Sequence, residues 1–291
     1  MSATFVQFLF AGLTVGAVYA LIALGFSLVY NASHVINFAQ GEFVMLGGLA
    51  AAFMVADGVP LGLAAVLAVL LAVAVALALY LFGIRPAHGA SVVALIIVTI
   101  GASILIRGLA GIVFDRNFHS LPPISGEEPI RILGAVVAPQ SLWVTGVTAL
   151  VALALWLFFS RTLWGKAMLA AAWNPLAAEL VGIDPRRVVL ASFALAGALG
   201  ALAGLLITPL APTHFQVGTM LGLKGFAAAI VGGLGSGPGA LVGGLVVGLV
   251  ESFAAGYLSS AYKDAIAFVI ILVALVVRPQ GLLGRAVAER V

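Results

Sequence analysis

A series of long apolar runs, each close to the length that crosses a lipid bilayer, constrains this chain more than any other feature. A helix needs about 20 predominantly apolar residues to span the roughly 30 Å hydrocarbon core. Two further segments, 42–56 and 222–235, are shorter and glycine-rich, and are compatible with short spans, re-entrant helices or broken helices. The seven longer runs fall at about 5–30, 61–84, 92–114, 140–159, 188–208, 238–256 and 264–277.

The composition agrees with a membrane environment. The chain is 64% hydrophobic and 8% charged, whereas a soluble domain carries about 25% charged residues. Its net charge of +3 is the balance of 13 basic and 10 acidic residues. The basic residues form no basic face, so we expect no nucleic-acid partner. With no cysteine, the chain has no disulfide framework and no thiol nucleophile.

The first apolar run is predicted to be a permanent span with its leading end outside, because it lacks the basic region and cleavage site of a signal peptide. Cytoplasmic loops carry an excess of Lys and Arg. If all nine segments cross, the N-terminus lies outside, the C-terminus lies inside, and most basic residues face the cytoplasm. These are Arg85, Arg161, Lys166, Arg186, Arg187, Arg278, Arg285 and Arg290.

The predicted fold class is therefore an all-α polytopic membrane protein with about eight or nine transmembrane segments, forming one transmembrane domain over residues 1–291. Four segments precede the span at 140–159 and four follow it, so the two halves enter the membrane in opposite orientations. Both short segments are second in their halves. Such inverted repeats with paired glycine-interrupted segments are typical of transporters, and the short segments indicate the substrate path.

The stretch "GGLGSGPGALVGG" at 232–244 resembles a phosphate-binding loop but lacks its chemistry. The Walker pattern requires a Lys followed by Ser or Thr, and the dinucleotide pattern requires a third glycine at a fixed spacing. Neither is present here, so we expect no nucleotide site and no nucleotide cofactor in this chain. Instead we predict a tight turn at 235–238, followed by a small-residue face for close helix packing. That face comprises Gly239, Gly243, Gly244 and Gly248.

Enzyme patterns are also missing. The chain has no G-x-S-x-G elbow and no H-E-x-x-H, and its four histidines lack metal-ligand spacing. We expect no catalytic residue and no metal site, which disfavours a membrane enzyme.

Polar residues within the apolar segments are candidate functional groups, because ionisable groups in a bilayer are costly. "VINFAQGEF" places Asn37, Gln40 and Glu42 before the first short segment. Two interpretations stay open: a polar break that lines the path of a zwitterionic solute, or a cap at an interfacial helix start.

Three other charged residues receive structural interpretations. Glu251 and Arg107 are each expected in the outer half of a span, either lining a vestibule or, as we favour, pairing with each other. Lys224 opens the second short segment and is expected to snorkel to the membrane interface.

The loop at 160–187 is predicted to be cytoplasmic and helical. Asn174 is suited to the N-cap and Pro175 to the first position of a short helix, and "VGIDP" ends that helix. An amphipathic helix pair of this kind either lies on the membrane or serves as a lever for a separate motor protein.

Taken together, these stretches resemble the LivH-type permease subunits of bacterial branched-chain amino acid ABC importers, over essentially the whole chain. The resemblance rests on "GLTVGAVYALIALGFSLVY", "INFAQGEFVMLG", "NPLAAELVGID", "KGFAAAIVGGLGSGPGALVGG" and "YKDAIAFVIILVALVVRPQGLLGR", which occur in family order.

The resemblance implies a set of partners and roles. Similar proteins lie in the bacterial inner membrane and pair with a second, related permease, two cytoplasmic ATPases and a periplasmic solute-binding protein. The ATPases bind the ATP and Mg. The outer loop 116–138 and residues 257–263 would meet the binding protein. Solute would pass near Asn37–Glu42 and the second short segment, which includes Lys224 and Gly225. ATPase coupling would involve Asn174, Pro175, Glu179, Gly182 and Asp184.

Departures from the family pattern leave the solute open. Many relatives have His where this chain has Gln40, Gly where it has Asn31, and Arg where it has Leu169. Related permeases also carry urea, amides or aromatic acids. A stand-alone secondary transporter is the competing class, but Glu42 and Glu251 are the only deep carboxylates that are candidates for ion coupling.

Overall fold

The computed structural model of the protein describes residues 3–87, 89–126, 128–278 and 280–284. Arg285 and Arg290, which entered the orientation argument, lie outside these residues. Within these described ranges, six helices are long and apolar enough to cross a membrane, and with the shorter helices they identify a polytopic membrane protein. The described α-helices are α1 Ala3–Ser33, α2 Gln40–Ala56, α3 Leu61–Ala78, α4 Val92–Val113, α5 Pro139–Arg161, α6 Leu163–Trp173, α7 Pro175–Leu180, α8 Pro185–Ile207, α9 Val217–Gly232, α10 Gly237–Tyr257 and α11 Lys263–Val277.

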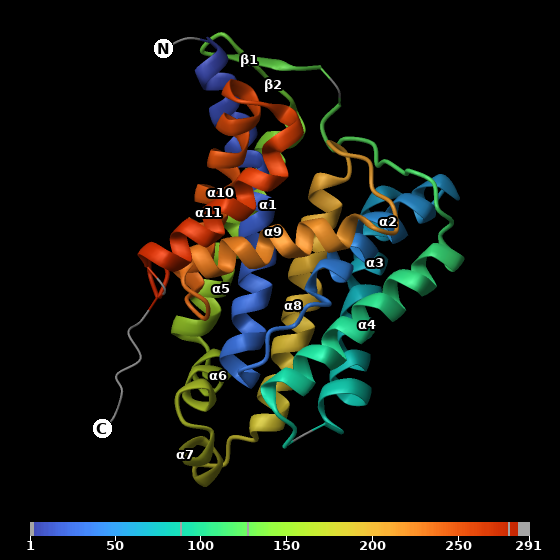
Figure 1. Cartoon of the computed structure of the whole chain (residues 1–291). Coiled ribbons are helices and arrows are strands. Elements are labelled where there is room, and N and C mark those ends of the chain that lie inside the picture. The colour runs from blue at the N-terminus through green and yellow to red at the C-terminus, as the bar shows by residue number, and fades with distance from the viewer. Residues whose placement is uncertain (1–2, 88, 127, 279, 285–291) are drawn as a thin grey trace.

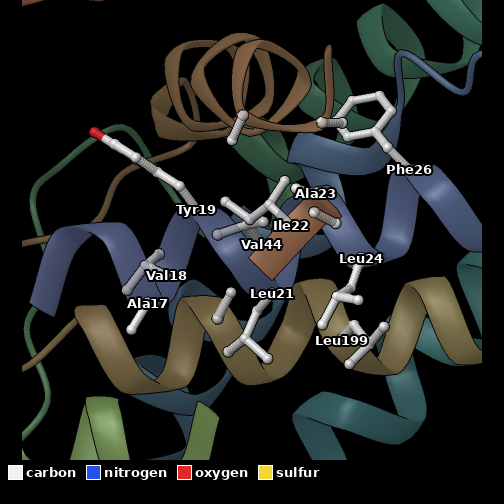
Figure 2. Packing of buried hydrophobic residues seen from close by; sticks show 14 of the residues in the cluster. Ala17, Val18, Tyr19, Leu21, Ile22, Ala23, Leu24, Phe26, Val44 and Leu199 are labelled. Atoms are coloured by element: carbon white, nitrogen blue, oxygen red, sulfur yellow. The ribbon is translucent and has the colours of Figure 1, made fainter. Parts of the chain in front are cut away.

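Helix α1 forms the centre of the bundle. Its middle is buried on all sides, and it packs against α5, α8, α9 and α10. Figure 2 shows its apolar side chains meeting Val44 of α2 and Leu199 of α8. A helix that is hydrophobic all round is expected in such a position.

The two short helices, α2 and α9, lie inside the bundle (Figure 1). Every residue of α2 from Gln40 to Ala52 is buried. The two helices touch where glycines remove the side chains: Gly41 lies against Gly218 and Gly222, and a Cβ at Gly41 would overlap the α9 backbone. Small residues therefore bring the two short segments into direct contact.

Three helices, α3, α4 and α5, leave wide apolar faces uncovered. Helix α3 buries only the stripe Ala64, Ala68, Ala72 and Ala76, and continues as a π-helical turn η1, Leu79–Ile84. Helix α4 buries only Thr99 and Ala110. Faces of this kind suit contact with lipid or with another membrane subunit.

The ends of the bundle differ in character (Figure 1). At the end that holds the N-terminus, a hairpin joins β1 Ile130–Ile132 to β2 Ala135–Val137 in antiparallel register. The side-chain amide of Gln7 fixes it to α1 by bonding both the N–H and the carbonyl of Val136, at 2.8 and 2.7 Å. Helices α6 and α7 lie at the opposite end.

The segment after α11 caps α9. The backbone N–H groups of Leu282 and Leu283 donate to the carbonyls of Val231 and Gly232, at 2.8 and 2.9 Å. These carbonyls belong to the last turn of α9, which has no helical partners for them. Gly233 has a φ of +105° at this point, a conformation that glycine adopts at little cost.

Candidate functional site

The three polar residues of "VINFAQGEF" are buried together at the start of α2. Asn37, Gln40 and Glu42 are each at most 1% exposed. The Asn37 side chain accepts from the N–H of Ala39 at 3.1 Å. The Gln40 amide donates to the carbonyl of Ala196 in α8 at 2.9 Å. Their burial places them in the interior of the bundle rather than at its surface.

Glu42 faces α4 and α9. Its Oε1 accepts a hydrogen bond from the Ser103 hydroxyl at 2.8 Å. Its Oε2 borders α9, where a Cβ on Gly218 would lie only 2.7 Å away. One turn along α4, Arg107 donates to the hydroxyl of Thr219, the residue after Gly218. The sequence pattern gave no signal for Ser103 or Thr219, because hydroxyls inside apolar helices usually bond their own backbone.

Each of the three polar residues keeps one buried atom without a hydrogen-bond partner among the described residues. The atoms are Asn37 Nδ2, Gln40 Oε1 and Glu42 Oε2. Most buried polar atoms in proteins are hydrogen-bonded, so each exception requires an explanation. Three exceptions within six residues mark this region as a candidate ligand path.

A second charged cluster surrounds Lys224 of α9. Its ammonium contacts Glu251 of α10 at 2.7 Å and Asp264 of α11 at 2.6 Å. The Tyr19 hydroxyl donates to the other oxygen of Glu251 at 2.8 Å. Lys224 also lies 5.7 Å from the centre of the Tyr19 ring. The cluster joins four helices.

This cluster corrects two expectations. Lys224 does not snorkel to an interface: it is 6% exposed and ion-paired. Glu251 does not pair with Arg107, which instead bonds Thr219. The partners of Glu251 come from helices far apart in sequence, a relation that local spacing does not reveal. Among the described residues, no hydrogen bond or ion pair joins Lys224 to the α2 cluster, and Gly225 packs against Ile22 of α1.

Segment 160–187 forms two short helices and the start of α8. Asn174 caps α7 by accepting from the N–H of Ala177 at 3.0 Å, with Pro175 in the first turn, as the sequence predicted. Gly182 ends this helix with φ at +84°, and Asp184 caps α8. Glu179 points from an exposed position. The outward apolar side chains of α7 are Leu176 and Leu180, followed by Val181.

Similarity to known proteins identifies the family of the chain. The sequence pattern of the family described as "Branched-chain amino acid transport system / permease component" matches residues 8–275. The chain belongs to this family. The permease is 34% identical to the high-affinity branched-chain amino acid transport system permease protein BraD of Pseudomonas aeruginosa, over 99% of this chain and 98% of BraD. It is 31% identical to LivH of Escherichia coli K12 over the same shares.

The fold also has a counterpart among solved structures. A chain of PsaBC from Streptococcus pneumoniae, in complex with a Fab, superimposes with a TM-score of 0.53. The alignment covers 96% of this permease and 97% of that chain, at 16% sequence identity. At this identity the likeness concerns the fold alone.

Helix α10 of the permease presents its glycines to two neighbours. A Cβ on Gly239 or Gly243 would overlap α9, and a Cβ on Gly244 or Gly248 would overlap α1. Between α1, α5, α6 and the turn before α10 lies a cavity of about 750 Å³, lined mainly by apolar side chains such as Leu24 and Pro238. The α2 cluster does not line this cavity.

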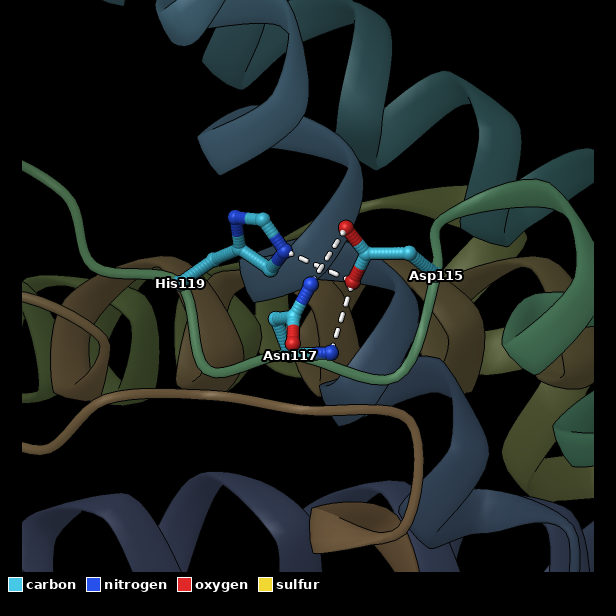
Figure 3. Close-up of polar contacts among 3 residues, drawn as sticks. All are labelled: Asp115, Asn117 and His119. Atoms are coloured by element: carbon cyan, nitrogen blue, oxygen red, sulfur yellow. Dashed lines mark hydrogen bonds and ion pairs between the residues drawn. The ribbon is translucent and has the colours of Figure 1, made fainter.

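The loop after α4 holds an exposed polar motif (Figure 3). The Asp115 carboxylate accepts from the N–H of Asn117 at 2.7 Å and lies 3.0 Å from a ring nitrogen of His119. These two contacts, the one to His119 foremost, lower the pKa of Asp115 below its ordinary value. His119 also forms an isolated β-bridge with Thr213, which ties this loop to the one before α9.

Proposed function

We propose that this permease is the membrane subunit of an ATP-binding-cassette importer that moves branched-chain or other hydrophobic amino acids from periplasm to cytoplasm by alternating access. The observation that carries the proposal is the match to BraD and LivH over 99% of the chain. In this proposal the permease is not itself catalytic and holds no cofactor; two cytoplasmic ATPases bind ATP and Mg. A second related permease and a periplasmic binding protein complete the complex.

The proposed topology has nine membrane segments in two inverted halves, with the N-terminus outside and the C-terminus inside the bacterial inner membrane. Helices α1–α4 form one half and α8–α11 the other, around α5. The packing supports this arrangement: α1 packs on α10 as α8 packs on α3, and α2 contacts α8 as α9 contacts α1. The exchange of partners is what a pseudo-twofold relation between the halves requires.

The proposed solute path runs along the contact between α2 and α9, past Asn37, Gln40 and Glu42. Three buried polar atoms without partners support it, since groups that meet a passing solute cannot all be satisfied within the resting protein. In the proposed mechanism, this permease rocks against the partner permease around these short helices.

The proposed coupling segment is α6–α7 and the loop that leads to α8. Its end of the bundle is opposite the β-hairpin (Figure 1), so one end is available to the ATPases and the other, with loop 116–138, to the binding protein. Asn174 and Asp184 hold the helix ends by side-chain caps. Pro175 and Gly182 bound the short helix, and Glu179 is exposed for contact.

The first test is mild purification of the tagged permease from native membranes with mass spectrometry of stoichiometric partners. We expect a second permease and two ATPases, and ATP-dependent uptake of L-leucine after reconstitution. Recovery of the permease alone, with uptake that persists without ATP, would overturn the importer assignment.

A second test addresses coupling. Glu179→Gln should leave the complex assembled but reduce leucine uptake per ATP hydrolysed, because Glu179 lies on the proposed docking helix. Asp57→Asn, which neutralises an exposed acid just after α2 and outside the proposed docking segments, is the control and should leave this ratio unchanged. Equal ratios in both variants and wild type would remove Glu179 from coupling.

A further inference from the structure

Helix α4 carries one polar stripe on an otherwise apolar surface. Thr99, Ser103 and Arg107 follow at intervals of four residues, so they lie on one face. Each meets a polar group of a neighbouring segment. The Thr99 hydroxyl bonds the backbone of residues 36 and 38, Ser103 bonds Glu42, and Arg107 bonds Thr219. The stripe therefore faces the junction of α2 and α9.

The Glu42 carboxylate is only half satisfied at this junction. Ser103 bonds one oxygen, and the other has no hydrogen-bond partner among the described residues. Taking a carboxylate out of water without a partner costs several kcal/mol. The first turn of α9 lies beside the free oxygen at Gly218, and a helix N-terminus favours negative charge. The surroundings thus leave one oxygen of an interior carboxylate available to a cation.

Arg107 is an incompletely used cation nearby. A guanidinium has five donors, and the bond that the structure shows for this side chain is the one to the Thr219 hydroxyl. Its charge acts electrostatically on Glu42, but no ion pair joins the two among the described residues. Ser103 and Arg107 are one turn apart, a rise of about 6 Å. The Glu42 carboxylate and the Arg107 guanidinium are therefore held near each other without an ion pair between them among the described residues.

We propose that Glu42 and Arg107 recognise the α-ammonium and the α-carboxylate of a zwitterionic amino acid during its passage. In this site Glu42 Oε2 accepts from the ammonium, Ser103 positions the Glu42 carboxylate, and Thr219 holds the guanidinium toward the solute carboxylate. A carboxylate and a guanidinium suit each other through paired, charge-assisted hydrogen bonds. This inference rests on the proposed function, because it assumes that solute passes between α2 and α9.

A small apolar cavity borders the same contact between α2 and α9, on the side of α8, and would accept a hydrophobic side chain. It has a volume of about 70 Å³ and is lined by Val44 of α2, Val217 and Leu221 of α9, and residues near the end of α8. Val217 directly precedes Gly218. By the same measure a cavity that holds one water has about 10–15 Å³, so this volume suits a small aliphatic group.

The same geometry disfavours uncharged solutes. Urea or an amide would leave the charges of Glu42 and Arg107 without counter-charges, and unpaired polar groups in a site reject a ligand that cannot satisfy them. Of the solutes that the wider family leaves open, the two charged side chains therefore favour an amino acid over urea or an amide.

The test uses the intact transport complex in proteoliposomes, with uptake of radiolabelled L-leucine and of radiolabelled acetamide, and with ATP hydrolysis measured in parallel. Glu42→Gln and Arg107→Gln should each lower leucine uptake at least about tenfold, because each leaves one solute charge unpaired. Arg107→Lys keeps the charge and should recover part of the uptake, whereas a purely structural role for the guanidinium would lower the melting temperature of the Arg107→Gln complex together with its uptake. Size-exclusion chromatography checks assembly.

Matched controls neutralise charges outside the site. The controls are Asp57→Asn and Arg85→Gln. Asp57 lies at the other end of α2, Arg85 follows the π-helical turn after α3, and both are exposed. Each should keep leucine uptake within about twofold of wild type, since exposed charges contribute little. If Glu42→Gln does not assemble, Arg107→Gln decides, because the arginine is partly exposed.

The outcomes separate the two proposals. If wild type takes up leucine but both glutamine variants do so at the wild-type rate, the zwitterion site is wrong and the importer assignment stands. If wild type takes up acetamide but no amino acid, the amino acid substrate and the zwitterion site both fail. Uptake of leucine that both variants abolish, with ATP hydrolysis retained, supports the site.

Discussion

The two short helices each carry one interior charge, and the two charges are treated in opposite ways. Lys224 of α9 has carboxylates on two sides and lies beside the Tyr19 ring. Glu42 of α2 has one hydroxyl and a free oxygen. The helices are second in the two proposed halves and contact each other through glycines. Position alone therefore does not decide what an interior charge does.

The difference indicates a division of labour. A buried ionic cluster whose members come from four helices fixes how those helices pack. Removing one member leaves the others buried without a partner. An interior charge without a counter-ion contributes nothing of this kind to packing, and its cost is explained if a ligand supplies the counter-ion. We therefore assign the Lys224 cluster to assembly and the Glu42 region to solute passage.

The strongest way to break this comparison is Lys224→Met. The variant leaves Glu251 and Asp264 without their cation, so we expect a loss of about 3–5 kcal/mol in the free energy of unfolding. Thermal unfolding of the purified complex in detergent, followed by size-exclusion chromatography, measures it. Lys263→Met removes an exposed lysine at the start of α11 and should be nearly neutral. Equal melting temperatures in both variants would deny Lys224 its structural role.

A smaller loss is expected from Tyr19→Phe. The change deletes the hydroxyl that donates to Glu251 at 2.8 Å and keeps the ring, so it should cost about 1.5–3 kcal/mol, the range for hydrogen bonds to charged groups. Tyr30→Phe is a matched control on the same helix, because the Tyr30 hydroxyl has no hydrogen bond within the described part of the chain. If the control is as destabilised as Tyr19→Phe, the loss does not come from the Glu251 bond.

Glu42→Gln tests the second of the two interior charges. Because the substitution removes an interior charge whose Oε2 has no hydrogen-bond partner among the described residues, and an amide oxygen still accepts from Ser103, we expect the free energy of unfolding to equal or exceed that of wild type. Glu251→Gln is the same substitution in the satisfied cluster and should lower the melting temperature. A larger loss in Glu42→Gln would mean that Glu42 is structural, against its assignment to the path.

Sequence reasoning found the elements more readily than their pairing. The cap at Asn174 follows from a residue type that acts on its own backbone, and the structure has it. The turn predicted at 235–238 is shorter in the structure, because Gly237 and Pro238 already belong to α10. Hydropathy placed the second short segment at 222–235, but α9 starts at Val217. The missed turn contains glycine, threonine and methionine, which form helix here without raising hydropathy to the level of a span.

The pairing of charges was harder to foresee. Tyr19 lies 232 residues from Glu251, and Lys224 lies 27 residues from it. Those contacts depend on how α1, α9 and α10 pack, which no local spacing encodes. Ser103 was missed for a related reason: a lone serine in an apolar helix carries no pattern until its neighbour is known.

The smallest expected effect concerns Asp115, a carboxylate exposed to water. It shows how a charge outside the bundle compares with the interior charges of Glu42 and Lys224. Asp115 is exposed, and its contacts with His119 and Asn117 lower its pKa. Because the folded pKa lies below the unfolded value of about 3.9, its stabilisation is present above that pH and is lost as pH falls through the lowered folded pKa. The protection of the amides of residues 115–119, which is their exchange rate relative to that of an unstructured peptide at the same pH, should therefore decrease below about pH 4. Asp115→Asn should remove this pH dependence while leaving the exchange of α2 and α9 unchanged. A global change in exchange would show that the loop is coupled to the interior charges rather than independent of them.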